Sequence, residues 1–374
     1  MSLTFVNAQC HCGRNSFKVG FQTSALPICS DLCHCTSCRH STGQLVINQV
    51  RFDGIPLSRT TDGPADFTHL MPYRTSDSAT RWFCSTCSAH ILWEYTEPNS
   101  WCVSVGSLEM SEGIVKLTHH IWVGDTVDGG IANYLRVIEG YELPRYSAGA
   151  REKETVPLIL PVPISEAKDN QNDILAAHCH CNAVRLSITR PSALSALPSS
   201  PYPDLIFPYI STPASKLDNP EDEKWWLRPA GVEKPTHYLA GHCACRSCRL
   251  TSGFEIQSWA FVPRKNIFFH SSASQEPVEL NLQDDNLRPE ALHRYVSNPG
   301  RNRESCRRCG ATVFWWGSER PDVVDVSVGL IDQSQGGVRA ENWLNWHKDR
   351  VSFSEDAISK TVIEGLVEGL RQSK

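Results

Sequence analysis

The sequence lacks the usual marks of membrane, secreted and nucleic-acid-binding proteins. Its 374 residues hold no apolar run close to the roughly 18 that a membrane-spanning helix needs. The start, MSLTFVNAQC, has no basic segment followed by an apolar core, as a secretory signal would. A net charge of −5 gives no reason to expect nucleic acid or an anionic membrane as a partner. We therefore expect an intracellular, cytoplasmic protein.

Cysteine, by contrast, is abundant, with sixteen residues in the chain. An even number would allow eight disulfides, but dense disulfide scaffolds are usually short secreted chains. Most of these cysteines fall in C-x-C and C-x-x-C pairs. Such pairs chelate a metal easily, whereas a disulfide within them would be strained. The pattern favours metal thiolates over disulfides.

The chain consists of two similar halves. The first half contains CHC (10–12), CHCTSC (33–38), RWFCSTCSAHILW (81–93) and VSVGSLE (103–109). The second half contains CHC (179–181), CACRSC (243–248), ESCRRCGATVFWW (304–316) and VSVGLID (326–332) in the same order. We also align IWVGD (121–125) with NWHKD (345–349). A repeat of this length indicates duplicated domains with one fold.

The domain limits follow from breaks in the apolar pattern. We assign the first domain to residues 1–144, a linker to 145–172 and the second domain to 173–374, because Pro, small and charged residues dominate the linker. A Pro-rich insertion at about 191–236 distinguishes the second domain. A loop of this length is commonly functional or disordered, so it could form either a lid over a site or an excursion on the surface.

The secondary structure is predicted to be mainly β. Short segments such as SFKVGF, AHILWEY and VVDVSVGL are rich in β-branched and aromatic residues and are bounded by turn formers. A short C-terminal helix is expected at 355–370, where Ile358, Val362, Leu366 and Leu370 share one face. The segment IANYLRVIEG (131–140) is interpreted as its shorter counterpart.

Ligand counting predicts two kinds of metal site in each half. Without Cys29 and Cys102, which have no partner in the second half, seven cysteines remain in each half. The C-x-C and the C-x-x-C together supply the four ligands of a closed, structural zinc site. These sets are Cys10, Cys12, Cys84 and Cys87 in the first half, and Cys179, Cys181, Cys306 and Cys309 in the second.

The other three cysteines of each half form a triplet. The two triplets are Cys33, Cys35 and Cys38, and Cys243, Cys245 and Cys248. Three protein ligands with one open position are typical of catalytic zinc. Alternatively, a histidine (His34, His40 or His242) closes the site and makes it structural. None of these histidines occurs at the same position in both halves, which favours the open site.

Other residues near the triplets are candidates for catalysis. Arg39 and Arg249 each follow a third cysteine, and either could offset thiolate charge, bind a substrate carboxylate or form an ordinary ion pair. No general base stands out. The candidates are His40, His119 and His120 in the first half, and Glu255 and His347 in the second.

The motifs together resemble a known family. The series C-x-C-G, C-H-C-x-x-C-R-x-x-(S/T)-G, F-C-x-x-C-x-x-x-L, V-x-V-G-S-L and H-I-W-V is similar to that of the glutathione-dependent formaldehyde-activating enzymes, which include the CENP-V proteins. The resemblance implies two tandem β-tent zinc domains. It also implies up to four zinc ions per chain, two structural at the four-cysteine sets and two catalytic at the triplets.

The resemblance further implies a carbon–sulfur lyase that acts on a thiol adduct, as the namesake joins glutathione to formaldehyde. The expected partner is a small molecule, and neither nucleic acid nor a membrane is expected. Assembly into a homo-oligomer is kept as an alternative. Neither half is a clean copy: Asn182 and Ser88 replace family glycines. Two alternatives therefore remain, a non-catalytic zinc-stabilised interaction module and a different lyase or isomerase step on a secondary metabolite.

Overall fold

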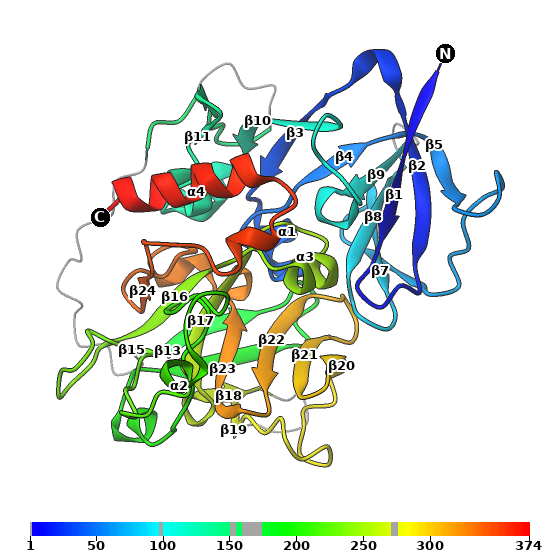
Figure 1. The fold of residues 1–374 in the computed structure, drawn as a ribbon. Helices are drawn as coiled ribbons and strands as arrows, with labels where there is room; N and C mark the ends of the chain where they lie inside the picture. Colours follow the sequence, from blue (N-terminus) through cyan, green and yellow to red (C-terminus); the bar gives the residue numbers. More distant parts are fainter. Residues whose placement is uncertain (1, 97–99, 150–154, 159–173, 271–275) are drawn as a thin grey trace.

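A computed structural model describes residues 2–96, 100–149, 155–158, 174–270 and 276–374. The chain is mainly β, as predicted. In Figure 1 the first half, blue to cyan, lies above the second half, green to orange. Most of the predicted linker, 145–172, lies outside the described residues.

The first half contains two antiparallel sheets and a parallel pair. A three-stranded sheet has the order β1 (Leu3–Gln9), β2 (Ser16–Gln22), β5 (Asp53–Ser58). A five-stranded sheet has the order β4 (Gln49–Arg51), β9 (Ser100–Ser104), β8 (His90–Tyr95), β7 (Ala79–Cys84), β6 (Leu70–Arg74). β3 (Ile28–Cys33) pairs in parallel with β10 (Val115–Ile121). Alternate residues face the core, as Phe17, Val19 and Phe21 do in β2.

The second half repeats this plan with a larger sheet. A four-stranded sheet has the order β13 (Ile174–His178), β14 (Arg185–Thr189), β18 (Ile267–Phe269), β19 (Val278–Glu279). The main sheet has the order β15 (Leu227–Arg228), β16 (His237–Cys243), β17 (Gln257–Pro263), β23 (Arg320–Ser327), β22 (Thr312–Gly317), β21 (Arg301–Cys306), β20 (Leu292–Asn298). β24 (Leu344–Trp346) pairs in parallel with β16, much as β10 pairs with β3.

Two short helices, α1 (Thr36–Thr42) and α3 (Arg246–Ser252), carry the triplet motifs to the contact between the halves. Gly43 and Gly253 end them in the left-handed conformation, with φ of 78° and 89°. A Cβ on Gly43 would lie 2.2 Å from the carbonyl oxygen of Thr312, and one on Gly253 would lie 2.0 Å from that of His90. Each glycine of the motif therefore permits close approach of the other half.

The C-terminal helix α4 (Lys360–Gln372) confirms the predicted amphipathic helix, although it begins five residues later than predicted, so Ile358 lies before it. Val362, Leu366 and Leu370 are buried, and they join a cluster with Leu135 and Ile138 of the first half. Figure 1 shows α4, in red, beside β11 (Val137–Ile138).

The segment 131–140 is not the helix that we predicted. It forms a 3₁₀ turn, Gly130–Asn133, followed by the hairpin of β11 and β12 (Tyr141–Glu142). Glu139 and Gly140, between these strands, both have positive φ. Such residues make a tight hairpin turn, which ends any helical path.

The insertion at 191–236 packs against the second half. It contains a 3₁₀ turn, Ala193–Ala196, the short helix α2 (Ala214–Leu217) and β15. Tyr202, Leu205 and Trp226 are buried in the main core of that half. The insertion is therefore part of the folded domain, and a few of its residues border the cavity described below.

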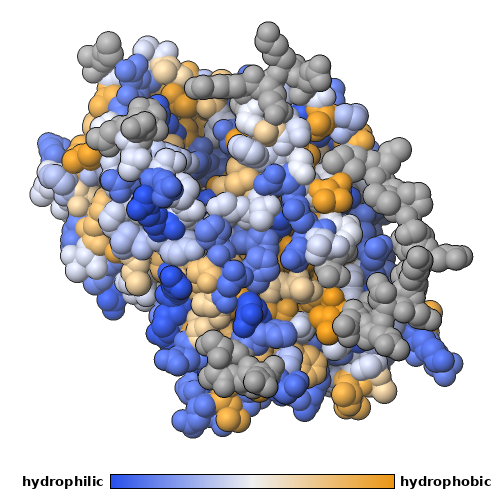
Figure 2. All heavy atoms as spheres, turned by 180° about the vertical axis from the view of Figure 1, so that it is seen from behind, coloured by the Kyte–Doolittle hydropathy of each residue, from blue (hydrophilic) through white to orange (hydrophobic). Residues whose placement is uncertain are grey.

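The molecular surface mixes residue types. Figure 2 shows hydrophilic and hydrophobic residues interspersed over the face opposite to that of Figure 1. This mixture is usual, because apolar atoms contribute much of any folded surface. Within the described residues, no helix combines the length and apolar character needed to cross a membrane.

Candidate metal centres and active-site cavity

The four-cysteine sets predicted from the sequence come together in space. In the first half, Cys10 and Cys12 follow β1, while Cys84 ends β7 and Cys87 lies in the next turn. The Sγ–Sγ distances are 3.4 Å for Cys10–Cys12, 3.8 Å for Cys10–Cys84 and 3.6 Å for Cys12–Cys84. Tetrahedral zinc with Zn–S bonds of about 2.3 Å separates its sulfurs by about 3.8 Å. The donor set therefore fits this metal.

The second half has an equivalent cluster. Its Sγ–Sγ distances are 3.4 Å for Cys179–Cys181, 3.6 Å for Cys179–Cys306 and 3.5 Å for Cys181–Cys306. Cys309 completes the group, whose sulfurs all lie within 4.8 Å of one another. All sixteen cysteines lie in the described part of the chain and none forms a disulfide. The thiols are thus available to a metal.

The triplets form two further clusters of the same compactness. Cys33 ends β3, Cys35 precedes α1 and Cys38 lies within it, with 3.6 Å between the sulfurs of Cys33 and Cys38. The backbone N–H of Cys38 donates to Cys35 Sγ at 3.3 Å. In the second half the N–H of Cys248 donates to Cys245 Sγ at 3.2 Å. The first turn of each helix thereby orients the middle cysteine.

The histidines considered as fourth ligands are engaged elsewhere. His34 Nε2 lies 2.9 Å from Nδ1 of His120. His40 Nδ1 donates to the carbonyl of His178 at 2.6 Å, and His242 Nδ1 lies 2.9 Å from Ser258 Oγ. Among the described residues, each triplet cluster consists of its three cysteines alone.

The structure places the two predicted arginines in the contact between the halves. Arg39 is fully buried, and its Nη1 donates to the carbonyls of Gly329 and Ile331 in the second half, at 3.4 Å each. Arg249 Nη1 donates in the same way to the carbonyls of Gly106 and Leu108 in the first half. Each guanidinium therefore binds backbone carbonyls in the V-S-V-G motif segment of the other half, which is VSVGSLE (103–109) or VSVGLID (326–332).

Two arginines that we did not predict touch the triplets instead. Arg81 Nη2 donates to Cys38 Sγ at 3.0 Å. Arg303 donates to Cys248 Sγ from Nη2 at 3.5 Å and to Ser247 Oγ at 3.1 Å. Burial alone would lower the pKa of Arg303, but the thiolate of Cys248 outweighs it and raises that pKa. Both arginines stand three residues before a C-x-x-C, a repeat visible in the sequence.

An acidic side chain caps each triplet helix, and it corrects our alignment of the two halves. Asp125 accepts from the N–H of Thr36 at 2.9 Å, and Asp356 accepts from the N–H of Arg246 at 3.4 Å. Trp122 and Phe353, three residues earlier, both have positive φ. The counterpart of 121–125 is therefore 352–356, and the alignment with 345–349 was wrong because the second half is seven residues longer here.

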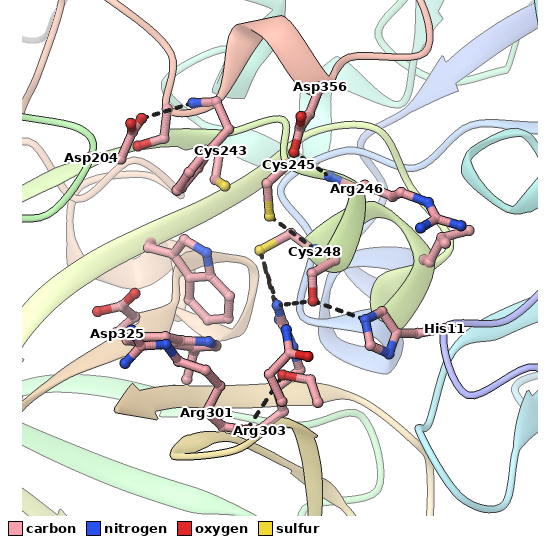
Figure 3. A pocket seen from close by; sticks show the side chains of 18 of the residues that line it. His11, Asp204, Cys243, Cys245, Arg246, Cys248, Arg301, Arg303, Asp325 and Asp356 are labelled. Carbon is pink, nitrogen blue, oxygen red and sulfur yellow. Dashed lines mark hydrogen bonds between the residues drawn. The ribbon is translucent and has the colours of Figure 1, made fainter. Parts of the chain in front are cut away.

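A cavity of about 690 Å³ opens beside the triplet of the second half. Figure 3 shows the sulfurs of Cys243, Cys245 and Cys248 gathered together, with Arg303 next to Cys248. Aromatic residues of the second half form part of the wall, namely Trp259, Phe261, Trp315 and Phe353. The insertion contributes Pro203, Asp204 and Tyr209, and the first half contributes Gln9, Cys10, His11 and Gly13. Both halves and the insertion therefore shape one cavity.

The residues predicted as general bases differ in their burial and in their contacts. His40 and His120 are buried, and desolvation lowers their pKa values to about 3 and about 4. Half-buried His119 lies 2.8 Å from Thr118 Oγ1. Glu255 and His347 border other hollows, outside the cavity at the second triplet.

The fold and the clusters describe a mainly β protein with four cysteine sets able to hold metal ions. The chain belongs to the family of the glutathione-dependent formaldehyde-activating enzyme, whose family model matches residues 5–125 and 231–346, more than half of the chain. The two matched regions correspond to the two halves. Neither a curated protein nor a solved structure matches the chain.

Proposed function

We propose that the chain is a zinc-dependent enzyme of the carbon–sulfur lyase type. Its substrate is the adduct of a thiol, such as glutathione, with an electrophilic small molecule. The observation that carries the proposal is the cavity of about 690 Å³ at the triplet Cys243, Cys245 and Cys248. Cavities of this size suit small molecules, and three protein ligands leave a metal position for one of them.

The cofactor in this proposal is Zn²⁺, up to four ions per chain. The two four-cysteine sets would hold structural ions, and the two triplets would hold ions of the catalytic type. When bound at a triplet, Zn²⁺ lowers the pKa of a thiol or hydroxyl ligand and orients it. The sulfur spacing and the free thiols support this assignment.

The residues around the second triplet have distinct parts in the proposal. Arg303 holds Cys248 in place and offsets the negative charge of three thiolates. Trp259 and Trp315 supply apolar walls that exclude water from the substrate. We assign Arg39 and Arg249 to joining the halves rather than to binding a substrate carboxylate, since both donate to backbone carbonyls.

We assign turnover to the second half. The triplet of the first half packs in a cluster with Ile47, Trp93 and Phe254, of which Phe254 comes from the second half. The second triplet packs with aromatic side chains too, but it borders the cavity. This difference supports a stabilising part for Cys33, Cys35 and Cys38, whose ion would be of the three-ligand type but would take no part in turnover. We also propose a cytoplasmic location. The likeness to CENP-V proteins and a homo-oligomeric state remain predictions.

A matched pair of variants tests this proposal. Cys245→Ala and Cys35→Ala each remove the middle cysteine of one triplet and leave both four-cysteine sets intact. We expect Cys245→Ala to lose nearly all turnover of an equilibrating thiol–aldehyde mixture, measured by NMR, and Cys35→Ala to keep most of it. Circular dichroism would verify the fold of both variants.

Other outcomes would point to the alternatives. Equal turnover by the wild type and Cys245→Ala would remove the triplet from catalysis and refute this proposal, whereas folded proteins that do not accelerate the reaction at all would be consistent with a zinc-stabilised interaction module. A wild-type protein that is inert towards thiol adducts would favour another lyase or isomerase step on a secondary metabolite.

A further inference from the structure

We propose that Asp325 is a catalytic residue of the second half, whose carboxylate accepts the proton of the substrate thiol and delivers it to the oxygen of the adduct. The inference rests on the proposed function and adds to it the group that moves the proton. Three observations support it: the position of Asp325 in the cavity, the state of its two oxygens, and the residue at its place in the first half.

Asp325 lies on β23, inside the cavity that borders the triplet. It is opposite Trp315 on β22 and Phe261 on β17, and both of these also line the cavity. The residue is 6% exposed, so a substrate in the cavity would displace most of the water that reaches it. In Figure 3 Asp325 and His11 lie on opposite sides of Arg303.

The partners of Asp325 leave one of its oxygens free. Arg320 Nη2 donates to Oδ1 at 2.7 Å, while Arg320 Nη1 donates to the carbonyl of Val323 at 2.9 Å. The same guanidinium lies over the ring of Trp315, 4.7 Å from its centroid. Arg320 is thus a positioning residue. Oδ2 of Asp325 accepts no hydrogen bond within the described part of the chain, so it can meet a substrate proton.

The other carboxylates that line the cavity are placed differently. Asp204 is saturated, because Oδ1 accepts from Arg350 at 3.0 Å and Oδ2 accepts from the N–H of Tyr209 at 2.8 Å. Asp356 is exposed and caps α3. Glu319 pairs with Arg301 and is about one-third exposed. Among the described residues that line the cavity, Asp325 is therefore the buried carboxylate with a free oxygen.

The histidine of the cavity is also engaged at both nitrogens. His11 Nδ1 lies 2.7 Å from the hydroxyl of Tyr295, and Nε2 lies 3.1 Å from Ser247 Oγ. A proton-transfer group needs a free atom within reach of the substrate. His11 therefore serves to join the first half to α3, and it leaves proton transfer to Asp325.

Burial also tunes Asp325 for this task. Desolvation raises its pKa to about 6, and the ion pair with Arg320 opposes that rise. A proton carrier works best when its pKa is near the working pH. The charged and titratable groups that act on Asp325 are Arg320 on β23, Arg303 on β21 and Cys248 on α3. The other such groups that line the cavity are His11, Asp204, Tyr209, Cys243, Cys245, Arg246, Arg301, Glu319 and Asp356.

The first half has a different residue at this place. Cys102 pairs with Trp93 across β9 and β8 as Asp325 pairs with Trp315 across β23 and β22. Burial raises the pKa of the Cys102 thiol to about 12, so it stays protonated at neutral pH. The first half therefore has no carboxylate at the position of Asp325, and the cavity borders the second triplet.

The proposed step is balanced without a further reagent. Asp325 takes the S–H proton, and the resulting sulfur anion attacks the carbonyl carbon to form the C–S bond. The π electron pair of the C=O bond moves to its oxygen, which then receives the proton from the Asp325 carboxylic acid. In the lyase direction the O–H proton returns to Asp325 and the C–S bond breaks.

The test is the pH dependence of turnover by the full zinc-loaded chain with a thiol and an aldehyde. For the wild type, kcat/KM should fall as the pH drops through about 6, because Asp325 becomes protonated. Asp325→Asn should lower kcat by about 10²-fold or more and remove that acid limb. Asp325→Cys, which introduces the residue of the first half, should lower kcat and remove the acid limb in the same way. The zinc content of this variant should be unchanged.

Asp322→Asn is the matched control. Asp322 lies on the same strand, pairs with Arg264 at 3.0 Å outside the cavity and is about half exposed, so turnover should be unchanged. Asp325→Asn with wild-type kcat and an intact acid limb would refute the role of Asp325 alone. A wild-type profile that is flat from pH 5 to 8 would refute it too, whatever the variants' stability. A wild type without turnover would overturn the proposed function and this inference together.

Discussion

The substitution Gly43→Ala tests how tightly the two halves interlock. Gly43 ends α1 with φ of 78°, a conformation that costs an ordinary residue about 1–2 kcal/mol. A Cβ here would also lie 2.2 Å from the carbonyl oxygen of Thr312, so backbone in the other half must move. Forcing atoms into packed structure costs about 1–3 kcal/mol more. We expect Gly43→Ala to lower the free energy of unfolding by about 2–5 kcal/mol in total.

Gly54 provides a control with nearly the same backbone and no neighbour. Its φ is 76° and no atom of the described residues lies within 4 Å of an added Cβ, so Gly54→Ala should lose only the conformational part, about 1–2 kcal/mol. Urea unfolding of the metal-loaded variants, followed by tryptophan fluorescence, measures both losses. Equal losses would refute the close contact between α1 and the second half.

Two further predictions concern single side chains. Arg303→Gln should weaken metal binding at the second triplet by about 10–100-fold, because the Cys248 thiolate loses its cationic partner. Arg81→Gln should do the same at the first triplet only. Chelator competition with each variant measures the metal affinity, and equal affinities before and after substitution would contradict the prediction. Burial raises the pKa of Glu255 from 4.5 to about 7. Between these two pH values the native state holds one more proton than the unfolded state, so the free energy of unfolding should fall as the pH rises through that window. Glu255→Gln should remove that part of the slope in unfolding curves recorded from pH 4 to 8, and parallel curves for the two proteins would count against it.

The metal-ligand sets could be predicted from the sequence because each is built from local motifs that occur twice. A C-x-C or C-x-x-C brings two thiols together through a single turn, whatever the rest of the fold does. The repeat then shows which pairs belong together, and the sulfurs of Cys10, Cys12, Cys84 and Cys87 do converge. The mainly β fold and the helix at the C-terminus follow from periodicity in the same local way.

Contacts between the halves could not be predicted in this way. Arg39 adjoins Cys38 in sequence, yet a helix sends neighbouring side chains to different faces, and its guanidinium reaches Gly329 in the other half. Arg81 is 43 residues from Cys38, and the two come together only in the tertiary fold. Its recurrence as Arg303 was a signal in the sequence, but nothing local tied it to the triplet.

The alignment error at the end of the repeat has a similar cause. The motif IWVGD shares only its Asp with SFSED, its counterpart at 352–356, whereas NWHKD offers both a Trp and an Asp at matching positions. The backbone requirement is shared instead: a residue with positive φ, then an aspartate that caps the triplet helix. Such a requirement becomes visible only in the structure.

The most direct test of the central claim is the metal content of the purified chain beside that of Cys245→Ala, measured by plasma mass spectrometry. If the triplets are metal sites with three protein ligands, the wild type should hold about four zinc ions and the variant about three, with the fold retained. About two zinc ions in both proteins would contradict the claim, because the four-cysteine sets alone would account for them.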